Sequence, residues 1–332
     1  MKKILNQPFA YVSEMLEGLC LAYPQYYKQI GAEGRVIVRA DGGVKGKVGI
    51  VTGGGSGHLP VFTGYVGKGL VDACAIGEVF SSPSVDQMVD AIRAADRGAG
   101  VLRLYGNYGG DNMNFDMAGE LLELEGIRTT TVRVADDVAS AGPRERSKRR
   151  GVAGLVYAYK LAGAKADALA GLEEVTATAQ KAVEACRSVG VALTPCTVPA
   201  VGRPTFSLSE DEMEIGMGIH GEPGVHREPL KPADSIAEEM LSLLLADMPL
   251  SSGDWISILV NSLGATPLEE LFIVYRYVAR RLTDLGIRIV MPLIGRYATS
   301  MEMAGMSLTF CKLDHDLEAL LRAPCDSPFL RV

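Results

Sequence analysis

Short runs rich in β-branched residues alternate with longer helical patterns along most of this 332-residue chain, and this alternation limits the fold more than any other feature. In the first half, patterns typical of strands lie at residues 36–39, 48–52, 72–76, 100–105 and 127–134. Helical periodicity lies between them, at residues 84–97 and 114–125. This succession of strand, glycine-rich loop, helix and strand predicts a sheet with parallel strands flanked by helices.

A second alternation of the same kind follows. Helical patterns at 151–164 and 172–190 close the first unit. Further strand patterns lie at 191–196, 212–217, 255–261, 287–292 and 308–313, with helical patterns at 236–246 and 268–285. A chain of this length exceeds the usual size of a single core. We therefore expect two α/β domains, residues 1–187 and 188–332, each with a central mostly parallel or mixed sheet flanked by helices.

The composition excludes several classes of protein. A net charge of −7 argues against general binding to nucleic acid. The six cysteines form no CxxC pair, which is typical of reduced thiols in a cytoplasm and not of a disulfide framework or a zinc site. No run approaches the roughly 20 apolar residues of a membrane span. We expect a cytoplasmic protein that contacts neither nucleic acid nor membrane.

Three segments are candidates for a binding site because of their positions after strands. Ligands of open α/β sheets usually bind at the carboxyl ends of strands. Residues 53–58 follow the strand predicted at 48–52, residues 106–111 follow the one at 100–105, and His220 follows a strand of the second unit. A cleft that draws on both domains is therefore expected.

The first segment reads Gly-Gly-Gly-Ser-Gly-His, ending at His58. It is not a P-loop, because no Lys-Ser/Thr pair follows the glycines. Successive backbone N–H groups could still hold an anion or a hydroxyl oxygen, and a purely structural turn is the alternative. Four glycines in five residues carry a high entropic cost, which favours close approach of the backbone to a ligand.

The second segment offers Asp111, in the sequence Gly-Asn-Tyr-Gly-Gly-Asp that starts at Gly106. This carboxylate could cap the following helix or act as a general base beside a substrate hydroxyl, and the spacing does not decide between them. A carboxylate at a helix N-terminus is expected to remain ionised.

The third segment sets His220 among glycines and Pro223, and the chain has only four histidines. An imidazole can serve as base, nucleophile or metal ligand near neutral pH; an ordinary buried histidine is the alternative, although the glycines favour an accessible ring. The formal GxGxxG pattern at 216–221 is not a dinucleotide fingerprint, because Pro223 and Gly224 oppose a helix directly after it. His220 and His226 lack an obvious third ligand, so we expect no metal.

Two further segments have structural explanations beside functional ones. Residues 144–150 contain five basic residues, which indicate either a solvated loop or a docking site for an acidic partner or a phosphate-bearing ligand. Thr266 followed by Pro267 is typical of a helix N-cap and the first helical position.

Together these segments resemble the substrate-binding K subunit of dihydroxyacetone kinases, over nearly the whole chain. The motifs that carry the resemblance lie at 53–58, 79–84, 106–115, 218–224, 261–267 and 299–307. The resemblance implies two α/β domains assembled as a homodimer. It implies that His220 forms a covalent hemiaminal with the carbonyl of dihydroxyacetone or another short ketose, and that His58 and Asp111 assist removal of the proton from the hydroxyl that accepts phosphate. Gly55, Ser56, Gly57 and groups near Gly106 would hold the substrate.

The sequence departs from the family at two positions. Leu59 stands where many members carry glutamate, and Gly106 where some carry lysine. Both departures would fit a subgroup that acts on another ketose, such as erythrulose, and a ketose-sensing regulator is a further alternative.

The chain contains no Walker lysine loop and no kinase-type glycine loop with its partner motifs. The resemblance implies that nucleotide, ADP or ATP with Mg²⁺, is bound by a separate helical L subunit. A phosphotransferase-system protein would rephosphorylate that nucleotide in place, or ATP would exchange directly; the sequence leaves both open.

Overall fold

The first sheet of the computed structural model, which describes residues 2–332, is mixed. Its strand order is β1-β2-β4-β3-β5-β6, and β4, β3, β5 and β6 run parallel while β1 and β2 pair antiparallel. The strands are β1 (Tyr27–Ile30), β2 (Val36–Arg39), β3 (Gly49–Ser56), β4 (Ala73–Val79), β5 (Val101–Gly106) and β6 (Thr129–Val134).

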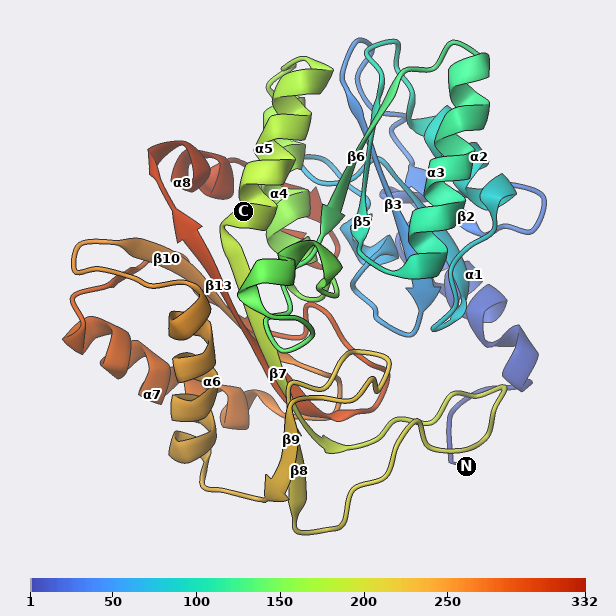
Figure 1. The fold of residues 1–332 in the computed structure, drawn as a ribbon. Coiled ribbons are helices and arrows are strands. Elements are labelled where there is room, and N and C mark those ends of the chain that lie inside the picture. The colour runs from blue at the N-terminus through green and yellow to red at the C-terminus, as the bar shows by residue number, and fades with distance from the viewer. Residues whose placement is uncertain (1) are drawn as a thin grey trace.

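Helices cover both faces of this sheet (Figure 1). They are α1 (Tyr11–Ala22), α2 (Val85–Ala95), α3 (Gly109–Leu124), α4 (Gly154–Asp167) and α5 (Leu172–Glu184). Successive residues of β3 face opposite cores: Val51 packs with α2 and α3, and Ile50 packs in the cluster that contains α4 and α5. This two-sided burial explains why the strand pattern at 48–52 is apolar without alternation.

The second sheet is also mixed, in the order β11-β10-β13-β7-β8-β9, with β12 beside β10. Its strands are β7 (Cys186–Thr194), β8 (Glu212–Ile215), β9 (His226–Pro229), β10 (Trp255–Ser262), β11 (Arg288–Ile289), β12 (Leu293–Gly295) and β13 (Ala304–Leu313). Helices α6 (Ala233–Asp247) and α7 (Leu268–Asp284) pack on one face, and α8 (His315–Arg322) packs in the core cluster of the other face. A short hairpin of β14 (Asp326–Ser327) and β15 (Leu330–Arg331) ends the chain.

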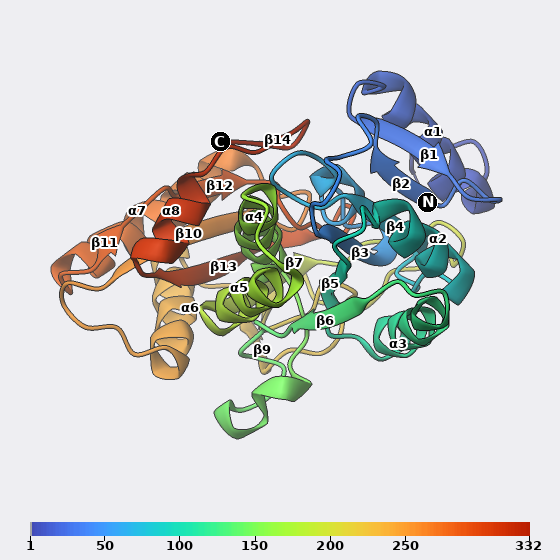
Figure 2. The same cartoon turned by 90° about the horizontal axis from the view of Figure 1, so that it is seen from above.

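Helix α4 joins the two halves. Twelve of its 14 residues are buried. It contacts β3, β5 and β6 of the first sheet and β7 and β13 of the second, and Figure 2 shows it between the sheets. The two sheets therefore share one hydrophobic cluster around this helix.

The predicted fold class of two α/β sheets flanked by helices is confirmed, and the domain boundary at residue 188 stays a prediction. Several element limits were wrong. The helix expected at 172–190 ends at Glu184, and the buried strand β7 follows at once from Cys186. Helices α1 and α8 and strands β1, β9 and β12 were not anticipated. Within residues 2–332, no helix is long and apolar enough to cross a membrane.

Candidate active site

The turn after β3 is tied to the segment before β13. The amide N–H of Met301 donates to the Gly57 carbonyl at 2.8 Å, and the amide N–H of Thr299 donates to the His58 carbonyl at 3.3 Å. The Thr299 hydroxyl donates to the Leu59 carbonyl at 3.1 Å. These bonds hold the predicted first loop against the second half of the molecule.

The two predicted histidines lie together in a cluster of aromatic rings. The ring centroids of His58 and His220 are 4.8 Å apart, edge to face. Phe80 stacks on His58 at 4.9 Å and meets His220 at 5.2 Å. Tyr108, from the loop after β5, meets His220 at 4.8 Å. All three predicted segments therefore converge at one place, as the sequence predicted.

His220 is oriented by a carboxylate two residues away. Its Nδ1 lies 2.9 Å from Glu222 Oε1, and its backbone N–H donates to Glu222 Oε2 at 2.9 Å. Burial opposes ionisation of Glu222, but the hydrogen bond and charge of His220 outweigh it and lower the pKa of Glu222 to about 2. In the neutral form of the ring, the ionised acceptor places the proton on Nδ1, which leaves the lone pair of Nε2 available for chemistry.

His58 has the same arrangement with a different acceptor. Its Nδ1 lies 2.7 Å from the carbonyl oxygen of Thr299, which can only accept, so Nδ1 carries the proton. Its Nε2 is buried and has no hydrogen-bond partner among the described residues. Burial, with a smaller effect of His220, lowers the pKa of His58 to about 3. The ring is thus a neutral hydrogen-bond acceptor.

Asp111 is buried at the third residue of α3, whose N-cap is Tyr108. The capping alternative is therefore wrong, because the cap lies three residues earlier. Burial raises the pKa of Asp111 to about 6, with partial opposition from the Ser82 side chain and His220. Burial thus outweighs the effect of the helix N-terminus on the pKa, but a pKa of about 6 still leaves the carboxylate ionised at neutral pH, as expected.

Unsatisfied polar atoms gather around these rings. Buried side-chain atoms without a hydrogen-bond partner in residues 2–332 include Ser56 Oγ, His58 Nε2, Tyr108 Oη, Asp111 Oδ1 and Asn112 Oδ1. Such atoms cost free energy unless a ligand or water completes their bonds. Ser56 ends β3, and the other four lie in the segments after β3 and β5. The site is therefore suited to a small ligand rich in hydroxyl groups.

Comparison with known proteins agrees with this chemistry. The sequence model of the Dak1 domain matches residues 17–329. The chain belongs to the Dak1 family. A Listeria innocua relative, a PTS-dependent dihydroxyacetone kinase 2, dihydroxyacetone-binding subunit, is 43% identical over the full length of both chains.

Two further members of the Dak1 family are instructive. An L-erythrulose kinase from Pectobacterium atrosepticum is 42% identical over the whole of this chain, which spans 56% of that longer protein. The solved structure of a dihydroxyacetone kinase operon co-activator has a TM-score of 0.88 at 33% identity, covering 94% of this chain and 96% of that one. The family thus includes proteins named for different ketoses and for regulation.

Sequence reasoning had missed the roles of Glu222, Tyr108 and Phe80 in this Dak1 site. The acidic residue two positions after His220 was a readable signal, because a carboxylate beside a histidine commonly fixes its tautomer. The two aromatic rings carried no such signal, since aromatic residues near strand ends are usually core.

The glycines of both segments serve the packing of the protein itself. A Cβ on Gly55 would lie 2.6 Å from the Ser81 backbone nitrogen, and one on Gly218 would lie 2.2 Å from Glu222 Oε2 and 2.6 Å from Arg150 Nη1. Gly218 thus lets Glu222 and Arg150 reach the loop that carries His220. These contacts give Gly55 and Gly218 a role in packing, while close approach of a ligand to the glycine segments and binding of substrate by Gly55, Ser56 and Gly57 stay predictions.

The basic run is exposed at residues 144–148, in agreement with the solvated interpretation, but its last two residues pack into the protein. Arg149 is 1% exposed and donates to both carboxylate oxygens of Asp247, at 2.9 and 2.6 Å. Arg150 donates to Asp137 at 2.8 Å and to the Gly216 carbonyl at 2.9 Å. It therefore supports the start of the loop that carries His220.

The two departures from the family lie differently around the site. Leu59 lines a cavity of about 610 Å³ with Tyr11 and Met15 of α1. A side chain on Gly106 would meet the ring of Tyr108 at 3.3 Å, and Tyr108 contacts His220. Position 106 therefore adjoins the ring cluster through Tyr108, whereas position 59 borders a cavity that Ser56 and Gly57 also line.

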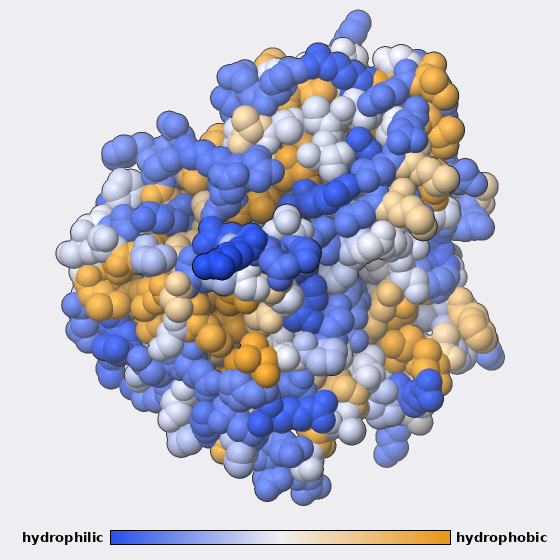
Figure 3. All heavy atoms as spheres, viewed as in Figure 1, coloured by the Kyte–Doolittle hydropathy of each residue, from blue (hydrophilic) through white to orange (hydrophobic). Residues whose placement is uncertain are grey.

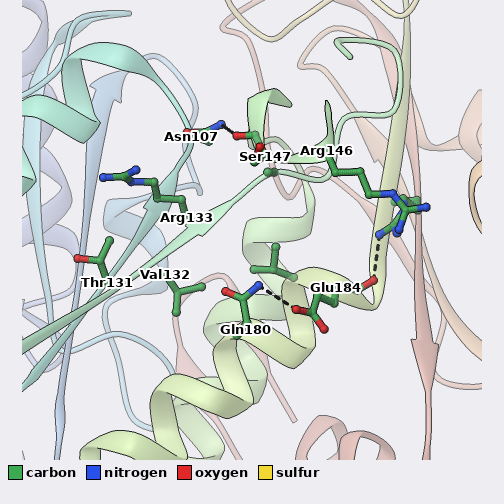
Figure 4. A pocket seen from close by; sticks show the side chains of 11 residues that line it. Asn107, Thr131, Val132, Arg133, Arg146, Ser147, Gln180 and Glu184 are labelled. Carbon is green, nitrogen blue, oxygen red and sulfur yellow. Dashed lines mark hydrogen bonds between the residues drawn. The ribbon is translucent and has the colours of Figure 1, made fainter. Parts of the chain in front are cut away.

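A wide cavity of about 790 Å³ lies beside β6 and does not include the three predicted catalytic residues (Figure 4). Arg133, Arg146 and Arg187 line it together with Glu184. Arg146 and Arg187 already pair with Asp247, so the groove is charged but largely neutralised.

A cluster of His226, Glu228 and Glu239 has ligand atoms within 4.8 Å of one another. His226 is exposed and is the first residue of β9. Lys231 pairs with both carboxylates, at 3.0 Å to Glu239. An ammonium group therefore takes the place that a cation would need.

Thr266 was predicted to be the N-cap of the helix that follows it. Helix α7 begins at Leu268 after Pro267, and the Thr266 hydroxyl donates instead to the Gly305 carbonyl at 2.7 Å.

Proposed function

We propose that this chain is the ketose-binding subunit of a dihydroxyacetone kinase. The observation that carries the proposal is the pair of histidine rings 4.8 Å apart, each with Nδ1 in a hydrogen bond, beside a buried carboxylate. The names of relatives at 43% identity over the full length support it.

Capture of the ketose is assigned to His220. The Nε2 lone pair forms a bond to the carbonyl carbon, the C=O π pair moves to oxygen, and that oxygen takes a proton from a water molecule, which leaves as hydroxide, to become the hemiaminal hydroxyl. The positive charge that develops on the ring is stabilised by ionised Glu222 through Nδ1–H. Covalent capture selects carbonyl compounds and offsets the few contacts that so small a ligand can make.

Activation of the hydroxyl is assigned to Asp111. Its raised pKa of about 6 leaves it ionised at neutral pH yet more basic than an ordinary aspartate. It accepts the hydroxyl proton as the oxygen bonds to the phosphorus of the donor and the donor's leaving group departs. His58, neutral and with a free Nε2, accepts a hydrogen bond from the ketose and orients it, and Ser56 with the backbone of Gly55, Gly57 and Gly106 would hold the remaining hydroxyls.

The phosphoryl donor is proposed to be ATP, or ADP rephosphorylated by a phosphotransferase-system protein, with Mg²⁺, on an L subunit. "PTS-dependent" in the name of the Listeria innocua relative supports the second route. We also propose a homodimer in the cytoplasm, where the six free cysteines would remain reduced; light scattering of the purified protein tests the dimer.

A coupled assay with dihydroxyacetone and candidate L subunits tests the function. Wild-type protein should turn over, and His220→Ala should lose at least about 1,000-fold in kcat/KM. Intact-protein mass spectrometry should show an adduct of one ketose on the wild type alone. Turnover by His220→Ala close to that of the wild type would disprove the covalent role.

Two alternatives are tested in the same assay. The 42% identity to an L-erythrulose kinase favours erythrulose as substrate, and comparing kcat/KM for the two ketoses decides this. The likeness to an operon co-activator favours a ketose sensor; adduct formation without turnover with any L subunit would support that reading. Asp111 and His58 weigh against it, because a sensor needs capture but no proton transfer.

A further inference from the structure

Helix α3 carries an exposed apolar stripe on its outer face. Met113, Met117, Leu121 and Leu124 are 65%, 53%, 46% and 86% exposed, at spacings of four, four and three residues that place them on one side of the helix. Figure 3 shows orange and pale-orange side chains gathered along the upper right edge, over α3. The opposite face, with Phe115, is buried in the core.

The stripe begins at the active site. The N-cap of α3 is Tyr108, whose ring meets that of His220 at 4.8 Å, and Asp111 lies in the first turn. Gly109 and Gly110 between them are exposed. Any protein that delivers a phosphoryl group to a hydroxyl beside Asp111 must approach this turn, and Met113 is two residues further along.

The charges beside the stripe indicate the kind of partner. Glu120 and Glu123 flank it, are exposed, and form no ion pair within residues 2–332. A second copy of this chain packed on the same face would bring like charges together, which is unfavourable. A partner with an apolar helical face and basic residues at its rim would be complementary, and methionines adapt well to such a surface.

We infer that this stripe is the docking surface for the phosphoryl-donor protein. The inference rests on the proposed function, and it identifies the exposed stripe of α3 as the surface that the phosphoryl-donor protein would contact. Apolar contacts along three turns of α3 would orient the donor, and the first turn would bring its phosphoryl group to Asp111.

The test uses the L subunit that supports turnover of the wild type in the coupled assay. The double variant Met117→Glu with Leu121→Glu should raise the KM for that L subunit by on the order of tenfold or more, and should weaken its direct binding by calorimetry to the same degree. The rate at saturating L subunit and the ketose adduct should be unchanged, since neither residue contacts the rings. A second variant, Met117→Leu with Leu121→Met, should retain wild-type values.

Leu21→Glu with Leu285→Glu is the matched control, because these leucines are 74% and 45% exposed on other elements. If the α3 variant binds and turns over like the wild type, the docking inference is wrong while the function stands. If the α3 variant loses self-association by light scattering but keeps its KM, the stripe contacts a second copy and the inference is also wrong. If no L subunit supports turnover of the wild type, the proposed function fails and the inference falls with it.

Discussion

The two histidines of the site share one hydrogen-bond arrangement in opposite surroundings. Both carry a proton on Nδ1 and present Nε2. His58 is 1% exposed and donates to a neutral carbonyl, whereas the side chain of His220 is 22% exposed and donates to the ionised Glu222. Two imidazole rings whose centroids lie 4.8 Å apart are thus in different electrostatic environments.

The difference in acceptor separates their chemistry. A carbonyl in a buried setting cannot compensate a charge, and burial lowers the pKa of His58 to about 3, so this ring can accept a hydrogen bond but resists protonation. A carboxylate stabilises positive charge on the imidazole it contacts, so His220 could gain charge during the proposed capture of the ketose. In the proposed function, His58 would orient the ketose and His220 would react with it.

The supports of the two rings differ as well. His58 follows directly on β3, a strand buried along its whole length. His220 lies in a loop that Glu222 and Arg150 hold from the side. We therefore divide the site into two halves: His220 with Glu222 and Arg150, which would capture the ketose, and His58 with Asp111, which would orient it and activate its hydroxyl. The following substitutions test whether these halves act separately, from the largest expected effect to the smallest.

Asp111→Asn should lower kcat by about 100- to 10,000-fold, because it removes the proposed base. Adduct formation on His220 should persist, since the capturing half is untouched. In the wild type, kcat should rise with pH through about 6, as the carboxylate must be deprotonated to act, and this limb should disappear in the variant. Loss of the adduct together with kcat would show that the halves are not separate.

The same substitution has a stability signature with a definite sign. The pKa of Asp111 is raised by burial, so the folded protein binds this proton more tightly than the unfolded chain does, and stability decreases as pH rises through about 6. Asp111→Asn should therefore raise the melting temperature above pH 6 and leave it nearly unchanged only below about pH 4, the ordinary pKa of an aspartate. Calorimetry at about pH 4 and about pH 8 measures this directly.

Glu222→Gln should weaken ketose capture by about 100-fold, because the neutral amide cannot stabilise a charged ring. The expected readout is a lower fraction of adduct at a given ketose concentration, with the pH limb of Asp111 retained in the residual activity. A Glu222→Gln variant that captures ketose like the wild type would remove the electrostatic distinction between the two histidines.

Arg150→Met should reduce capture by about tenfold through a looser loop, without affecting hydroxyl activation. It also leaves Asp137 unpaired, which should cost about 3–5 kcal/mol in the free energy of unfolding. The double variant with Asp137→Asn should recover stability in urea denaturation but not capture. Recovery of both would show that Arg150 acts on the fold and not on the position of His220.

The sequence predicted most of this site because its chemistry lies in short segments after strands. His58, Asp111 and His220 could be chosen as scarce or polar residues at strand ends, and the general rule for ligand position in α/β sheets placed them together. The electrostatic settings could not be read in the same way. The acceptor of His58 is the carbonyl of Thr299, 241 residues away, and the raised pKa of Asp111 depends on burial by the whole fold.

The errors in the fold have a related origin. The apolar spacing of 172–183 fits a helix and continues into Val189, but Cys186–Thr194 is a strand because β13 and β8 pair with its two edges. A buried strand and a buried helix cannot be distinguished by short apolar runs alone. The long-range ladder with β13 overrides the local pattern.

Leu59→Glu restores the residue that many family members carry and should have the smallest effect. The side chain borders the cavity that Tyr11, Met15, Ser56 and Gly57 also line and is not part of the ring cluster, and the Leu59 carbonyl is held by the Thr299 hydroxyl. The ratio of kcat/KM for dihydroxyacetone and erythrulose should therefore change by less than about tenfold, or about 1.4 kcal/mol. A change of about 100-fold or more would mean that the turn carrying His58 selects the ketose, and that orientation and selection belong to the same half of the site.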